Sequence, residues 1–266
     1  MWYQGNNTTL EVINGSWLYP LSLFPTINDE IYIDNGNFYR RVEKWNIHQS
    51  NTIPLIYVCD ECFDLFVSIN NTLYCAMASF HQVIATSSDN SFNPFAILAG
   101  TGVAGSSSTT LNYPYGIFVD INYDLYVADC GNDRVQLFHP GQSNAVTIAG
   151  NGASNTINLD CPIGIILDAD KYLFIVDHNN HRIVGSGPNG FRCLVGCSGG
   201  LGSTADRLFY PQSLSFDSYG NIYIADRANN RIQKFILATN SCGTSNHTSF
   251  VKLEEFSSIK RFDLIE

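Results

Sequence analysis

Three carboxylate–amide–arginine groups recur along this chain and are its clearest candidates for chemistry. All have the pattern Asp-x-x-Asn-x-Arg, and the copies are Asp129, Asn132 and Arg134; Asp177, Asn180 and Arg182; and Asp226, Asn229 and Arg231. A carboxylate beside a guanidinium can take part in acid–base catalysis, and carboxylates that converge can hold a metal ion. The copies are 48 and then 49 residues apart. This regular spacing favours a structural role, because a group present in every repeat serves to build the repeat.

Each of these groups lies between two short strands. Apolar segments at 125–128, 173–176 and 222–225 come directly before the three aspartates. We expect the Asp to end one strand, the Asn to cap the turn by bonding backbone groups, and the Arg to open the next strand facing the Asp. A surface ion pair of this kind stabilises a hairpin by about 0–1 kcal/mol. A catalytic role for the motif is therefore disfavoured.

The hairpins belong to longer units of four strands, a to d. The clearest unit spans 113–150, and two further units begin near 161 and 210. Weaker copies match the first unit at offsets of 52 and 94 residues, which gives five units in all. A period of this length, with short strands and polar turns, indicates a fold built from repeated four-stranded units. We expect the a strands, at 21–25, 64–68, 116–120, 164–168 and 213–217, to line a central channel.

The repeat motifs resemble those of a known family. Tyr-Pro-x-Gly-Ile at 113–117, Leu-Tyr-Val-Ala-Asp at 125–129 and Asp-x-x-Asn-x-Arg-Ile-Gln-x-Phe at 226–235 are similar to NHL repeats, the units of a β-propeller family. The resemblance implies an all-β propeller of about five four-stranded blades at residues 1–240, followed by a C-terminal tail at 241–266. The family usually has six blades, so a truncated six-bladed ring is the alternative.

The fifth unit has no obvious d strand after Phe235, whereas residues 9–13 near the N-terminus have a strand pattern and no blade of their own. We expect this N-terminal strand to pair with residues 232–236 and close the last blade. An unpaired apolar edge strand would otherwise invite aggregation.

Cysteines and glycosylation sequons favour an oxidising compartment. The 266 residues include eight cysteines, and Asn-x-Ser/Thr sequons occur at Asn6, Asn7, Asn14, Asn70 and Asn246. Such features are typical of secreted proteins and ectodomains. The chain shows neither a signal peptide nor a membrane-spanning apolar run. We expect a piece of a larger secreted or membrane-anchored protein, with no membrane insertion by this segment.

The positions of two cysteine pairs favour structural disulfides. Cys130 and Cys161 fall at a b–c turn and at the start of the next unit, while Cys193 and Cys197 flank the end of one strand. Cys59-x-x-Cys62 permits a zinc or redox interpretation. Zinc needs four ligands, and no second ligand pair lies nearby in the sequence. A redox pair needs a helix N-terminus, and the surrounding segments are strands.

Enzymes and nucleic-acid-binding proteins are the alternatives that the resemblance implies. Propellers similar to peptide-amidating lyases hold a metal with histidines around the channel, but none of the six histidines falls in an expected a strand. Lactonase-like propellers need polar groups that point into the channel, for which the candidates are Glu61, Asp64, Gln212 and Ser213.

NHL domains of tripartite-motif proteins bind RNA through a basic face, or serve ubiquitin ligases whose activity resides in a RING module. This chain has 14 Lys and Arg against 24 Asp and Glu, a net charge of −10, and no RING-type array of Cys and His. Nucleic acid is therefore an unfavourable partner. We expect a non-enzymatic binding or scaffolding module without a cofactor. Its loops would recognise an unidentified protein, or else a glycan or small ligand. The alternatives are a metal-dependent propeller enzyme and a tripartite-motif-related interaction domain.

Overall fold

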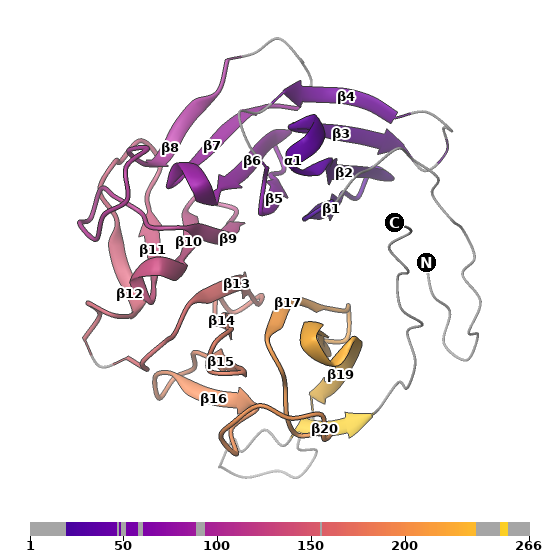
Figure 1. Cartoon of the computed structure of the whole chain (residues 1–266), viewed down its shortest axis with the longest axis vertical. Coiled ribbons are helices and arrows are strands. Elements are labelled where there is room, and N and C mark those ends of the chain that lie inside the picture. The colour runs from indigo at the N-terminus through magenta and orange to yellow at the C-terminus, as the bar shows by residue number, and fades with distance from the viewer. Residues whose placement is uncertain are drawn as a thin grey trace.

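Five antiparallel sheets, each with four strands in chain order, make up the protein (Figure 1). The computed structural model describes residues 20–46, 48, 52–57, 61–88, 94–154, 156–237 and 251–254. The expected all-β propeller with five blades is confirmed, and no sixth sheet occurs among these residues.

The strands match the units read from the sequence. Blade 1 contains β1 (Leu23–Pro25), β2 (Glu30–Asp34), β3 (Arg41–Asn46) and β4 (Thr52–Tyr57). Blade 2 contains β5 (Asp64–Val67), β6 (Thr72–Met77), β7 (Gln82–Ser87) and β8 (Ala96–Gly100). Blade 3 contains β9 (Pro114–Val119), β10 (Leu125–Asp129), β11 (Arg134–Phe138) and β12 (Val146–Gly150). Blade 4 contains β13 (Pro162–Leu167), β14 (Leu173–Asp177), β15 (Arg182–Gly185) and β16 (Arg192–Val195). Blade 5 contains β17 (Pro211–Phe216), β18 (Ile222–Asp226), β19 (Arg231–Leu237) and β20 (Val251–Glu254).

Short helical turns join the second and third strands of four blades. They are α1 (Gly36–Tyr39) and the single 3-10 turns η1 (Ala78–Phe80), η2 (Cys130–Asn132) and η3 (Arg227–Asn229). Within the described ranges, no helix has the length and apolar character that a bilayer crossing requires.

The first strand of every blade lies at the centre of the molecule. Figure 1 shows β1, β5, β9, β13 and β17 closest to the central axis, with the fourth strands outside. Consecutive inner strands also contact one another, from β1 to β5, β9, β13 and β17. The expected order from the channel outwards is therefore confirmed. Each a–b turn opens at one end of the channel, and each b–c turn lies at the opposite end.

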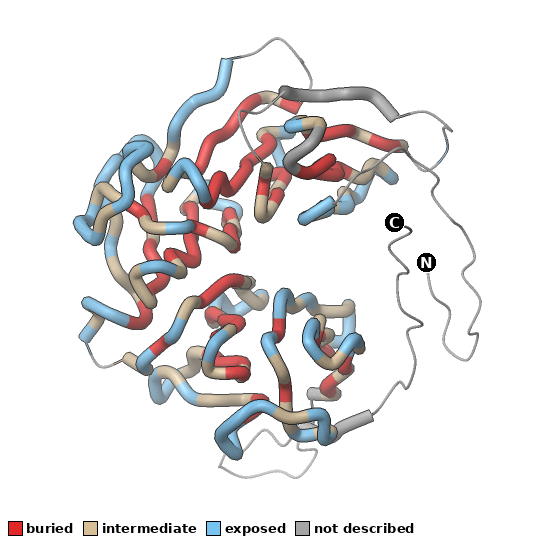
Figure 2. Tube along the Cα trace, viewed as in Figure 1, coloured by how far each residue is buried: buried red, intermediate tan, exposed pale blue. Residues whose placement is uncertain are grey.

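The hydrophobic core lies in the seams between blades rather than in one central mass. Four clusters of buried side chains join blades 1 and 2, 2 and 3, 3 and 4, and 4 and 5. Figure 2 shows this burial mainly along the second and third strands of the blades, whereas the inner strands β1 and β17 carry exposed and intermediate residues, as do most loops. The described residues form no fifth cluster between the last blade and the first. The apolar alternation of each strand explains the arrangement, because its two sets of side chains face the two neighbouring blades.

Neighbouring inner strands approach so closely that one position must be glycine. A Cβ atom at Gly116 in β9 would collide with the carbonyl oxygen of Ile163, which precedes Gly164 in β13. Blades 3 and 4 have glycine at this point of the repeat, and at Gly116 the close approach of the two backbones leaves no room for a side chain.

The last blade takes its fourth strand from the C-terminal segment, which corrects one expectation. β20 pairs antiparallel with β19, with Phe235 opposite Leu253. The prediction that the N-terminal strand at 9–13 closes this blade is wrong, and that segment itself lies outside the described residues. The physical reason is loop closure, which costs less for a hairpin connection of some dozen residues than for one that spans the whole chain. At least Val251–Glu254 thus belong to the propeller rather than to a separate tail.

Candidate functional site

The three Asp–Asn–Arg groups lie in separate blades and hold loops in place. Asp129 is fully buried, and its carboxylate accepts hydrogen bonds from Arg134 Nε at 2.8 Å and Asn132 Nδ2 at 2.8 Å. The same atoms join Asp177 to Arg182 at 2.7 Å and Asp226 to Arg231 at 2.7 Å. This is the within-blade pairing expected from the repeat.

Each group also holds the loop that leads into its own blade. The Asp129 carboxylate accepts the backbone N–H of Asn112 at 2.6 Å, and Arg134 donates to the carbonyl oxygens of Ser106, Ser107 and Thr110. Burial raises the pKa of Asp129, and the hydrogen bonds from Asn132, Asn112 and Arg134 oppose that rise. The donors and acceptors of the motif are thus engaged by protein groups, which suits a structural role.

Two histidines of the b–c turns bond the next blade. His81 Nδ1 accepts the backbone N–H of Tyr113 at 3.1 Å, and His181 Nδ1 accepts that of Tyr210 at 3.2 Å. In these bonds Nδ1 carries no proton. Asp133 has the same place in blade 3, where it accepts the N–H of Cys161 at 2.8 Å. No group of three His, Cys, Asp or Glu side chains suited to a metal occurs in the described part of the chain.

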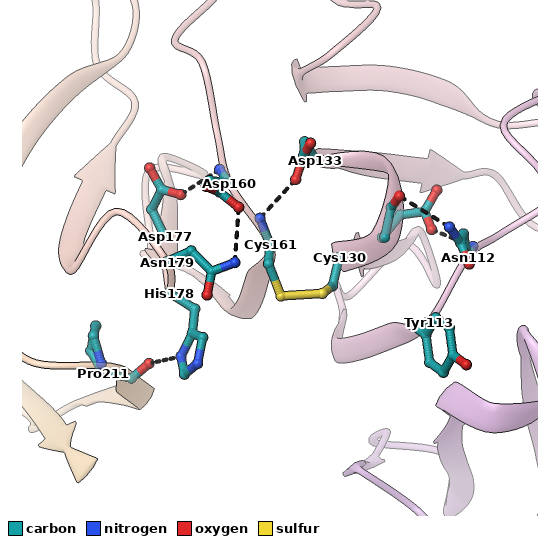
Figure 3. Close-up of a disulfide and its surroundings, with 12 residues drawn as sticks. Asn112, Tyr113, Cys130, Asp133, Asp160, Cys161, Asp177, His178, Asn179 and Pro211 are labelled. Carbon is teal, nitrogen blue, oxygen red and sulfur yellow. Dashed lines mark hydrogen bonds between the residues drawn. A yellow bond between two sulfur atoms is a disulfide. The ribbon is translucent and has the colours of Figure 1, made fainter. Parts of the chain in front are cut away.

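His178 lies beside the seam between blades 4 and 5. Its Nδ1 bonds the carbonyl oxygen of Pro211 at 2.8 Å, and burial lowers the pKa of the imidazole, with Arg227 and His181 adding to the effect. Figure 3 shows this bond together with two others: the backbone N–H of Asp160 donates to the Asp177 carboxylate, and Asn179 Nδ2 donates to the Asp160 carboxylate. Together these contacts fix the b–c turn of blade 4 against its neighbours.

The described residues contain three disulfides. Cys130 bonds Cys161 across the seam between blades 3 and 4, as Figure 3 shows, and Cys193 bonds Cys197. These are the two pairs that the sequence positions favoured. The third bond joins Cys62 to Cys75. The sequence did not indicate this pairing, because the proximity of the two cysteines depends on how β5 and β6 pair. Disulfides of this kind are typical of an oxidising compartment.

The candidates for a polar site in the channel belong to two blades, blade 2 and blade 5. Asp64 lies at the start of β5, where its carboxylate accepts the N–H of Ile117 at 2.9 Å from the neighbouring blade. Burial raises the pKa of this carboxyl to about 7. Glu61 is half-buried ahead of the same strand, while Gln212 and Ser213 are exposed on blade 5. Asp64 thus ties blade 2 to blade 3.

Exposed isoleucines gather at the other end of the channel. The tips of the a–b turns in blades 1, 2 and 3 are Ile27, Ile69 and Ile121, and their exposed fractions are 99%, 80% and 73%. We call the end of the propeller formed by these turns the a–b turn face. The sequence already contained the signal, because the repeat offsets of 94 and 52 residues align Ile27 and Ile69 with Ile121.

A cavity opens on the a–b turn face at the mouth of the channel. Its volume is about 340 Å³, and the ends of β5, β9 and β13 line it together with their turns. Its lining includes Phe66, Ile69, Phe118, Ile121, Leu167 and Ala169. A second cavity of about 330 Å³ lies further out, between blades 2 and 3, beside Tyr123 and His139.

Comparison with known proteins agrees with the propeller architecture. A streptogramin B lyase is 12% identical with a TM-score of 0.63, and the match covers 90% of this chain and 70% of that one. A chain of a nidogen/laminin complex is 18% identical with a TM-score of 0.63, and the match covers 82% of this chain and 75% of that one. A protein of unknown function from Bacteroides thetaiotaomicron is 15% identical with a TM-score of 0.64, covering 81% of this chain and 57% of that one. At these identities the likeness shows the fold alone.

No curated protein matches the sequence. The family model for the NHL repeat matches residues 210–235, which hold β17, β18 and most of β19. This segment includes Asp226, Asn229 and Arg231. The chain therefore carries an NHL repeat within a five-bladed β-propeller, and the family resemblance seen in its motifs is confirmed.

Proposed function

We propose that this propeller is a non-enzymatic module of a larger extracellular protein, and that it binds a protein partner through the a–b turn face. One observation carries the proposal: isoleucine stands at the tip of the same turn in three successive blades, and all three side chains are exposed. Exposed apolar side chains that gather on one surface mark sites of protein interaction.

The turn itself does not require isoleucine. The equivalent tips in blades 4 and 5 are Ala169 and Ser218, and both turns have the same backbone bond, from Lys171 N to Asp168 O and from Gly220 N to Asp217 O. Polar and small residues are also the ones that favour such turns. The isoleucines therefore point to a role outside the fold of the blade.

Other features support the extracellular and non-enzymatic parts of the proposal. The three disulfides suit an oxidising environment, and the sequon at Asn70 is exposed. The repeated carboxylates and the inter-blade histidines are engaged in structural bonds. The nidogen/laminin complex is a protein assembly, and the streptogramin B lyase is an enzyme, so the likeness of fold is compatible with either class. The charge of −10 weighs against nucleic acid as the partner.

The test compares variants of the two ends of the channel. Ile27→Ser, Ile69→Ser and Ile121→Ser are combined, with Ser218 of blade 5 as the precedent for serine at this position. The matched control combines Val103→Ser and Leu201→Ser, which are exposed apolar residues in the loops at the opposite end. All proteins also carry Asn70→Asp, which removes the sequon so that no glycan covers the tip of the blade 2 turn. Aspartate is chosen because Asp170 occupies the equivalent position in blade 4.

Partners are captured from extracellular fluid by cross-linking, purified, and titrated against each variant. We expect the triple serine variant to bind at least about tenfold more weakly, since losing several apolar contacts costs more than about 1.4 kcal/mol. The control should bind as the parent does. If the triple variant binds the partner as tightly as the parent, the a–b turn face is not the binding surface. If the purified protein contains stoichiometric metal and turns over a lyase or lactonase substrate, it is a metal-dependent enzyme instead.

A further inference from the structure

We propose that the cavity at the channel mouth is a socket for one large apolar side chain of a partner protein, and that a basic residue adjoins this side chain in the partner. The inference rests on the proposed function, since it assigns the partner chemistry of the a–b turn face.

The floor of the socket is aromatic and aliphatic. The rings of Phe66 and Phe118 lie 5.3 Å apart between centroids, with Phe24 packed on Phe66 at 4.9 Å. Leu167 of blade 4 completes the lining. A cavity of about 340 Å³ is at the lower end of the range for ligand sites, which suits a single side chain rather than a whole cofactor.

The three blades contribute the socket from the same position in the repeat. Val67, Val119 and Leu167 are equivalent residues of β5, β9 and β13, and all three line the cavity. Phe66 and Phe118 line it from the preceding position, where blade 5 has the exposed Ser215. Ile69 and Ile121 stand at the edge of the socket, and Ala169 takes their place in blade 4. The alanine occupies less of the edge than an isoleucine would, so we expect a side chain to enter the socket past Ala169.

The surroundings of the socket are acidic. Asp120 and Asp168 line the socket, and Asp170 lies on the same turn as Asp168. Lys171 also lines the socket and bonds Asp120 at 3.1 Å. The a–b turns of blades 1 and 5 carry two further carboxylates, Asp29 and Asp217. Together with the net charge of −10, this arrangement favours a cation beside the bound apolar group. A segment with Trp, Phe or Leu next to Lys or Arg has this chemistry.

The probes are two capped tetrapeptides, acetyl-Gly-Trp-Lys-Gly-amide and acetyl-Gly-Trp-Glu-Gly-amide, titrated against the full chain by calorimetry and NMR. We expect saturable binding of the lysine peptide with a Kd of about 0.1 to 1 mM. The glutamate peptide should bind about fivefold more weakly. The difference between the peptides should shrink in about 0.5 M NaCl, because salt screens exposed charges.

The variant Ala169→Trp fills the open side of the socket from an exposed turn. Ser218→Trp places the same side chain at the same turn position in blade 5, outside the socket. We expect the first variant to lose at least about tenfold in affinity for the lysine peptide and the second to stay within about twofold. Ala169→Arg, which closes the same opening with a cation, should match Ala169→Trp. Thermal unfolding of all three verifies that the fold is retained.

Several results would contradict the proposal that the cavity binds an apolar side chain next to a basic residue. These are an absence of saturable binding by the lysine peptide, equal affinity of the two peptides at low salt, and equal effects of Ala169→Trp and Ser218→Trp. The proposed function is tested separately by the isoleucine variants. If the purified partner loses affinity for the triple serine variant but binds Ala169→Trp normally, the a–b turn face stands and the socket is wrong.

Discussion

At the scale of single residues, the repeated Asp–Asn–Arg group acts as a structural clamp. Asp177 shows this clearly: its side chain is fully buried and accepts bonds from Arg182 Nε, Asn180 Nδ2 and the backbone N–H of Asp160. Removing one partner of a buried ion pair leaves a desolvated group uncompensated. We expect Asp177→Ala to lower the free energy of unfolding by about 3 to 5 kcal/mol.

The matched control for Asp177→Ala is Lys171→Ala. Lys171 pairs with Asp120 at 3.1 Å, but its side chain is 54% exposed. Solvent screens such a pair, so the loss should stay below about 1 kcal/mol. Urea unfolding of both variants measures the difference. Similar losses for the two variants would contradict the clamp.

A second residue-scale prediction concerns Asp64. Burial raises the pKa of Asp64 to about 7, while an unfolded aspartate titrates near about 3.9. The folded state therefore keeps a proton that the unfolded state loses between about pH 4 and pH 7, and stability falls as the pH rises through this window. Asp34, whose pKa burial raises to about 6, lowers the stability in the same direction as the pH rises.

Asp64→Asn should remove the larger part of this loss of stability with rising pH, because asparagine does not titrate. Its amide oxygen can still accept the N–H of Ile117. Above pH 7 we expect the variant to exceed the parent by about 1 to 4 kcal/mol, towards the lower value because the side chain is only partly buried. Denaturant unfolding from about pH 4 to pH 8 measures the slope. An unchanged slope would show that Asp64 titrates at its ordinary pKa.

At the scale of elements, blades 2, 3 and 4 have a close contact between the end of the fourth strand, at Gly100, Gly150 and Gly196, and the b–c turn. Gly150 ends β12 with a φ of +80°, and a Cβ atom there would collide with the carbonyl oxygen of Asp133. We expect Gly150→Ala to cost about 2 to 4 kcal/mol, from backbone strain and from the displaced turn. Gly141 is the control, since its φ is +73° but a Cβ atom at this position would meet no atom within 4 Å.

Gly141→Ala should therefore cost only the strain, about 1 kcal/mol. Thermal unfolding distinguishes the two substitutions. If both substitutions lower the Tm equally, the collision at Gly150 costs no stability, and the contact between β12 and the b–c turn does not stabilise the blade.

At the scale of the whole molecule, stability depends on how the blades are joined. The Cys130–Cys161 disulfide crosses a seam and closes a loop with a sequence separation of 31, whereas Cys193–Cys197 has a separation of 4. A longer closed loop loses more entropy in the unfolded chain. We expect the double variant Cys130→Ser and Cys161→Ser to lose about 2 kcal/mol more than Cys193→Ser and Cys197→Ser. Urea unfolding of both pairs measures this, and equal losses would contradict the entropic origin.

The sequence by itself determined the repeat, its strands and the place of each inner strand. These features follow from local patterns: apolar alternation sets which faces of a strand are buried, and Asp and Asn set where it turns. The clamps of Asp129, Asp177 and Asp226 were predictable for the same reason, because Asp and Arg are five residues apart in one hairpin.

Only the tertiary structure decided which distant segments meet. Local pattern favoured residues 9–13 for the last strand, and the pairing of Phe235 with Leu253 shows that β20 takes that place. The bond between Cys62 and Cys75, and the meeting of Ile69, Ile121 and Ala169 around one cavity, likewise arise when separate strands are brought together. Such contacts depend on distances in three dimensions, which strand periodicity leaves open.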